Sequence, residues 1–78
     1  MPILETFKGV KIHVYNGEHR PAHIHGVYNE YEVLLEIESG RVYAGSLPKR
    51  QQKIALDWLI ENRDWALHVF YELNSELR

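Results

Sequence analysis

Residues 23–38 read H-I-H-G-V-Y-N-E-Y-E-V-L-L-E-I-E, and this stretch decides the fold. Apolar and polar side chains alternate on both sides of residues 29–30, which is typical of two half-buried strands joined by a two-residue turn. Such a turn pairs Tyr28 with Tyr31 and fixes the register of the whole hairpin. The sequence therefore predicts an antiparallel hairpin at the centre of the protein.

The segments next to this hairpin continue the alternating pattern. Residues 10–15 alternate between apolar and polar side chains, and this strand is predicted to end at Asn16-Gly17. A two-residue turn at Ser39-Gly40, which would pair Ile37 with Val42, leads into a further strand over residues 41–44. We expect an antiparallel meander of three or four strands. One face of it should form the core, through Ile24, Tyr28, Tyr31, Val33, Leu35, Ile37, Val42 and Ala44.

The apolar period changes at about Lys49. Apolar residues first recur at the spacing of one helix face, and a second such apolar stripe follows residues 62–64. Asn62 or Asp64 could cap a new helix there. The two stripes consist of Ile54, Ala55, Trp58 and Leu59, and of Ala66, Val69, Phe70 and Leu73, with Trp65 nearby. We expect one or two C-terminal helices on one face of the sheet, with Trp58 and Trp65 in the core. The fold class is α+β, and the other sheet face is expected to face solvent.

Composition narrows the class of protein. A chain of 78 residues has room for a single domain, residues 1–78, and without cysteine it has neither disulfides nor thiolate metal ligands. A formal net charge of −2 gives no support to a protein that binds nucleic acid mainly through phosphates, although a local basic patch is conceivable. No signal peptide or membrane span is evident, so we expect a soluble cytoplasmic protein without membrane contact.

Three of the five histidines, His19, His23 and His25, lie within seven residues. Residues i and i+2 of a strand point the same way, about 6.5–7 Å apart, so His23 and His25 can converge on one Zn²⁺ ion. Either His19 or Glu36 would supply a third ligand. In a plainer interpretation, His23 pairs with Glu36 across the hairpin and has no chemical role.

A catalytic interpretation uses the same histidines. In a small hydrolase, most plausibly an RNase, His23 or His25 would act as general acid or base, and Lys11 or Arg41 would stabilise a phosphate. The predicted register places further polar neighbours on this face. They are Glu36, Tyr43 and Lys11, together with His13, Tyr15, Glu32 and Glu38.

Four segments carry a family resemblance over nearly the whole chain: K-G-V-K-I-H-V-Y, H-R-P-A-H-I-H, Y-E-V-L-L-E-I-E-S-G-R-V and G-S-L-P-K-R. They resemble the small prokaryotic family catalogued as domain of unknown function 4160. Its histidine motif falls on His19, Pro21, His23 and His25, while Ala22 stands where a second proline is common and Gly26 where a β-branched residue is usual. The resemblance implies a gene context similar to toxin–antitoxin modules, in which this chain would be the toxin-like component held by a small protein partner.

Overall fold

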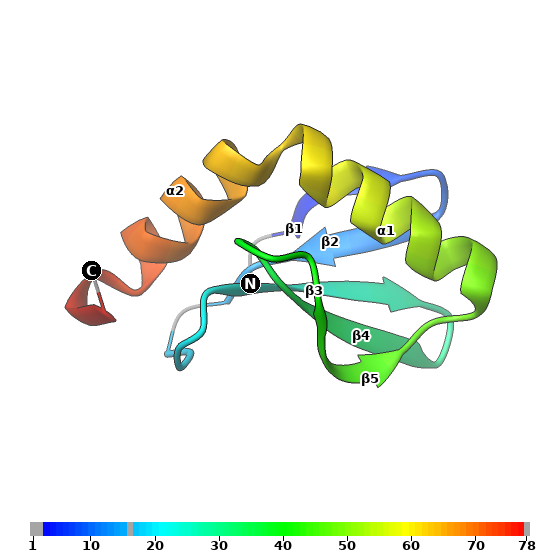
Figure 1. The fold of residues 1–78 in the computed structure, drawn as a ribbon, viewed down its shortest axis with the longest axis horizontal. Helices are drawn as coiled ribbons and strands as arrows, with labels where there is room; N and C mark the ends of the chain where they lie inside the picture. The colour runs from blue at the N-terminus through cyan, green and yellow to red at the C-terminus, as the bar shows by residue number, and fades with distance from the viewer. Residues whose placement is uncertain (1–2, 16, 78) are drawn as a thin grey trace.

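The computed structural model describes residues 3–15 and 17–77. The strands in these ranges are β1 (Ile3–Phe7), β2 (Val10–His13), β3 (His23–Tyr28), β4 (Tyr31–Glu36) and β5 (Val42–Ser46). The helices that follow are α1 (Lys49–Glu61), α2 (Arg63–Leu73) and the short 3-10 helix η1 (Ser75–Leu77). Each strand pairs antiparallel with the next, in the order β1-β2-β3-β4-β5, and the two long helices pass over one face of the sheet (Figure 1). The predicted α+β class is confirmed.

The sheet has five strands in the described residues, so the expectation of three or four was too low. The additional strand is β1, which pairs Phe7 with Val10 across a tight turn at Lys8 and Gly9. Both turn residues have positive φ, 51° and 87°, as the hairpin turns that match strand twist require. The five-residue segment I-L-E-T-F shows little alternation by itself. Its pairing with β2 therefore decides its conformation.

The central hairpin has the predicted register. Tyr28 pairs with Tyr31, and His23 pairs with Glu36 at the other end of β3 and β4. Asn29 in the turn has a φ of 53°, a conformation that asparagine tolerates better than most residues. The end of the preceding strand differs from the prediction, since β2 stops at His13. Asn16, where we expected that end, lies outside the described residues.

The predicted register of the next hairpin is wrong. Val42 pairs with Leu35 rather than with Ile37, and the ladder is irregular between Leu34 and Leu35. The cause is a wider turn, in which the Glu36 carbonyl accepts a hydrogen bond from Gly40 and the Glu36 N–H donates to the Arg41 carbonyl. From Ala44 onward the ladder is displaced by one residue from the predicted register, with Ala44 opposite Leu34, and a displacement of one residue changes which side chains face the core.

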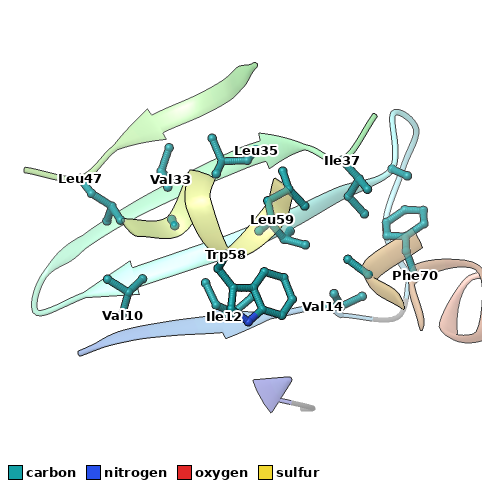
Figure 2. Packing of buried hydrophobic residues seen from close by; sticks show 14 residues of the cluster. Val10, Ile12, Val14, Val33, Leu35, Ile37, Leu47, Trp58, Leu59 and Phe70 are labelled. Carbon is teal, nitrogen blue, oxygen red and sulfur yellow. The ribbon is translucent and has the colours of Figure 1, made fainter. Parts of the chain in front are cut away.

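The core lies between the sheet and the helices, with Trp58 and Leu59 of α1 set over the strands (Figure 2). Trp58 is also tied to the edge strand β1, because its indole N–H donates to the Glu5 carboxylate at 2.8 Å. The buried apolar residues are Val10, Ile12, Val14, Ala22, Ile24, Val33, Leu35, Ile37, Leu47, Ala55, Trp58, Leu59, Ala66 and Phe70. Three residues expected in the core, Tyr31, Val42 and Ala44, are exposed instead. Val42 and Ala44 belong to β5, the edge strand next to β4.

Two helices form rather than one, and they meet at Asn62. Asn62, one of the two predicted caps, occupies the N-cap position of α2, but its side chain donates to the Trp58 carbonyl and not to the start of α2; Asp64, the alternative, lies within the first turn. The expectation that Trp65 lies in the core is wrong, because its side chain is 45% exposed; its ring centroid lies 6.1 Å from that of Trp58. No helix in the described ranges is both long enough and apolar enough to cross a membrane.

Candidate metal centre

His23 and His25 alternate with the core residue Ile24 along β3, as the register predicts, but they do not face solvent. The His23 side chain is only 3% exposed and that of His25 only 12%. Aromatic rings cover them: Tyr43 lies 5.4 Å and Phe70 5.6 Å from His23, and Tyr15 lies 4.6 Å from His25, between ring centroids. The expectation of an open polar sheet face is therefore wrong at this position.

Glu18 is the residue that joins the two histidines. Its Oε1 lies 3.0 Å from Nε2 of His23 and 2.8 Å from Nε2 of His25. Glu18 belongs to the connection between β2 and β3, and its side chain is 22% exposed. One carboxylate oxygen thus lies between two largely buried imidazoles.

Helix α2 holds this connection in place through Asn74, which follows its last residue and is fully buried. The Asn74 Oδ1 accepts a hydrogen bond from the Glu18 backbone N–H at 2.8 Å. Its amide group donates to the Tyr15 carbonyl and to the Phe70 carbonyl, both at 2.9 Å. The position of Glu18 therefore depends on a residue 56 positions later in the chain.

The other ring nitrogen of each histidine also has a partner. The Nδ1 of His23 lies 2.7 Å from the Pro21 carbonyl, which can only accept, so the ring carries a proton at Nδ1. The Nδ1 of His25 lies 2.8 Å from Oε2 of Glu32. In metalloproteins, a carbonyl or carboxylate at one ring nitrogen fixes the tautomer that directs the other nitrogen to the metal.

The contacts among Glu18, His23 and His25 are satisfied only if positive charge lies at their centre. A neutral His23 with its proton on Nδ1 directs a bare Nε2 lone pair at the Glu18 carboxylate, which is also an acceptor. Neutral His25 has one proton for two carboxylate contacts. Two neutral imidazoles thus supply two N–H donors for four contacts, so either additional protons or a cation must complete the arrangement.

Glu18 itself is held in its charged form. Burial opposes ionisation of this carboxyl group, but the hydrogen bonds from His25 and His23 and the nearby imidazole charges outweigh it and lower the pKa of Glu18 below its ordinary value. The ionised form of Glu18 is therefore favoured as long as the two imidazoles donate to it.

Glu18, His23 and His25 also meet the geometric requirement for a metal site. One ligand atom from each lies within 4.8 Å of the other two. A tetrahedral Zn²⁺ with bonds of about 2.0–2.1 Å keeps its ligand atoms about 3.3 Å apart, so the two contacts of Glu18 would lengthen by only a few tenths of an ångström. Imidazole and carboxylate together are a donor set that suits Zn²⁺ and other first-row transition metals.

The remaining predicted site residues have varied positions. His19 is exposed and does not belong to this trio, where Glu18 provides the third ligand atom. Glu36 lies opposite His23 in the register, but its carboxylate accepts a hydrogen bond from Ser39. Tyr43 contacts His23, as expected of a neighbour. The structure does not test the catalytic or metal-binding roles, which stay predictions.

Lys11 lies two residues before His13 on β2, next to the cluster. Burial lowers the pKa of His13, and the charges of His25 and Lys11 add to this effect. His13 also stacks on Tyr15, and its buried Nδ1 has no hydrogen-bond partner among the described residues. The neutral form of His13 is thus favoured beside the candidate centre.

Two residues of the candidate site are missed by sequence reasoning, Glu18 and Asn74. A signal for Glu18 exists, since it is a carboxylate five residues before His23 in a connection that already carries the histidine motif. Asn74 has no comparable signal, because a single asparagine at a helix end usually indicates only a helix terminus.

The model of a family described as "Domain of unknown function (DUF4160)" matches residues 9–70. This range includes Glu18, His23 and His25 and ends at Phe70, before Asn74. No curated protein and no solved structure matches the chain.

Proposed function

The chain belongs to the DUF4160 family, and from that premise and the geometry of Glu18, His23 and His25 we propose that it binds a transition-metal ion, with Zn²⁺ as the ion to test first. One observation carries the proposal: two imidazole Nε2 atoms and one oxygen of the Glu18 side chain converge, while both Nδ1 atoms have acceptors of their own. A divalent cation supplies the positive charge that the neutral imidazoles lack.

Three protein ligands leave a coordination position open, as in zinc hydrolases with two histidines and one glutamate. An ion in such a site would hold a water with a pKa of about 7, which is the nucleophile that the hydrolase interpretation requires. In this proposal His23 and His25 are ligands. The acid or base role considered for them from the sequence would then pass to the bound water, and Tyr43 would border the site.

Metal binding is tested by thermal unfolding of metal-free protein at pH 7 with increasing Zn²⁺. Zinc at 100 times its Kd should stabilise the native state by about 2.7 kcal/mol, which for a domain of this size raises the midpoint by about 10–20 °C. The imidazole resonances of His23 and His25 should shift together. An unchanged midpoint and unchanged resonances at saturating zinc would exclude the site.

Two variants separate this site from adventitious binding. Glu18→Gln keeps the size of the side chain and removes the charged ligand, and its amide can still donate to the Nε2 lone pairs, so the fold should persist while zinc affinity falls. His19→Ala is the matched control, since His19 is exposed and lies next to Glu18. A loss of zinc affinity in His19→Ala with none in Glu18→Gln would show that the ligands are misassigned.

A second candidate function is the partner role implied by the family resemblance. We propose that the chain acts as the toxin-like component of a toxin–antitoxin-like pair, held by a small protein encoded next to it. Strand β5 supports a protein partner, because all five of its residues are exposed at an edge of the sheet. Co-expression with the product of the neighbouring gene should yield a stable complex, and separate elution at micromolar concentration would contradict this role.

A further inference from the structure

Strand β5 is an edge strand whose free side is available for pairing. It follows β4 at the end of the strand order, and its five residues, V-Y-A-G-S, are all exposed. Val42 is 50% exposed and Tyr43 49%, large values for apolar and aromatic side chains. Such an edge presents unpaired backbone N–H and C=O groups to any extended chain that approaches it.

A groove runs beside this edge, between β5 and α1. Its volume is about 430 Å³, within the range of roughly 300–1,000 Å³ that is usual for ligand pockets. Apolar side chains from both elements and from the core form much of its wall. The lining residues are Leu35, Gly40, Val42, Ser46, Leu47, Lys49, Gln52, Lys53 and Leu56. A strand added to β5 could direct alternate side chains into this groove.

The charged residues that line the groove are all basic. Lys49 and Lys53 line it and Arg50 lies between them in the sequence, while the first turn of α1 contains no acidic residue. The Asp57 carboxylate pairs with Lys53 at 3.1 Å, but this ion pair is exposed and therefore weak. It does not neutralise the positive charges of Lys49 and Arg50. The groove is therefore apolar inside and basic along its α1 rim.

We propose that β5 and this groove bind an extended segment of a partner protein, in which every second residue points toward the groove and is either apolar or acidic. The backbone of that segment adds a sixth strand next to β5, its apolar side chains enter the groove, and a carboxylate lies against Lys49 and Lys53. A second copy of this chain fits less well, because β5 contains no acidic residue to meet the basic rim. This inference rests on the proposed partner role and requires no bound metal.

The test uses the full chain in the presence of EDTA and a synthetic nine-residue peptide with blocked ends, in which threonine alternates with valine in the first half and with glutamate in the second half, so that valine and glutamate share one face. Backbone amide resonances are followed by NMR as peptide is added. The largest shifts should fall on residues 42–46 and on the first two turns of α1. A peptide with lysine in place of glutamate, and one N-methylated on alternate amides to remove the strand donors, should each bind at least about fivefold more weakly.

Charge reversal in the protein gives the matched comparison. Lys53→Glu should weaken the binding of the acidic peptide at least about fivefold and strengthen that of the lysine peptide. Lys8→Glu is the control, since Lys8 lies in the turn between β1 and β2 at the opposite edge of the sheet, and it should leave both affinities unchanged. Shifts located elsewhere, equal binding of both peptides, or no shift at millimolar peptide would overturn the proposal.

The outcome can be separated from that of the partner role itself. If the neighbouring gene product binds but Lys53→Glu does not weaken the complex, the partner role stands and this docking surface is wrong. If the peptide binds β5 as described but the neighbouring gene product does not bind, the surface stands and its partner has to be sought elsewhere. Dimerisation of the chain through β5, detected by sedimentation, would also overturn the assignment to an acidic partner.

Discussion

Replacing Asn74 by alanine should destabilise the protein and release the connection that carries Glu18. Asn74 is fully buried and makes three hydrogen bonds through its side chain. The Phe70 carbonyl would keep a partner in the variant, since it also accepts the Asn74 backbone N–H. The Glu18 N–H and the Tyr15 carbonyl would lose theirs.

The cost follows from these two backbone groups. An unpaired buried polar group costs about 1–3 kcal/mol, and both groups are only partly buried, so about 2–3 kcal/mol in total is expected. A domain of 78 residues has a free energy of unfolding of about 4–12 kcal/mol, so this is a substantial fraction. The thermal midpoint should fall by at least about 8 °C.

Two measurements check the prediction. Urea unfolding gives the loss of stability, with Ser75→Ala as a control that should stay within about 0.5 kcal/mol of the wild type because Ser75 is exposed. Hydrogen exchange of the Glu18 amide gives the local effect, which should be much faster in Asn74→Ala. A loss below about 1 kcal/mol, or unchanged protection of the Glu18 amide, would refute the argument that Asn74 holds this connection.

Three further predictions concern other parts of the molecule. The pKa of Glu18 is lowered in the folded state, so the contribution of its ionised form to stability is complete above the ordinary pKa of 4.5 and is lost as the pH falls below it. The urea midpoint of the metal-free protein should therefore drop more steeply on acidification than that of Glu18→Gln. Gly45→Ala should cost more than about 1 kcal/mol in urea unfolding, because Gly45 has a φ of 69° and a Cβ would lie 2.3 Å from the Glu32 carbonyl oxygen; an unchanged midpoint would mean that β5 shifts freely. Trp58→Phe should lower stability by about 1–3 kcal/mol, because the hydrogen bond from the indole to the Glu5 carboxylate is lost. The backbone amide of Glu5 in β1 should then exchange faster, and an equal exchange rate would contradict this link.

The prediction of the central hairpin succeeded because its determinants are local. A two-residue turn at Asn29 and Glu30 and the alternation on both sides of it leave one register that buries Ile24 and Val33 together. The predicted register of the hairpin at Ser39-Gly40 was wrong because its determinants are not local. Its turn is wider than two residues, and the bonds made by Glu36 that set its width cannot be deduced from the turn residues alone.

The sequence by itself determined the α+β class, the apolar stripe of each helix and the face of β3 that carries His23 and His25. These features depend on alternation and on helical spacing, which are properties of neighbouring residues. Only the tertiary structure decided that these histidines are covered, that Glu18 joins them and that Asn74 holds Glu18 from the far end of the chain. Contacts of this kind depend on how a long connection and a distant helix end pack together, and no local pattern in the sequence encodes that packing.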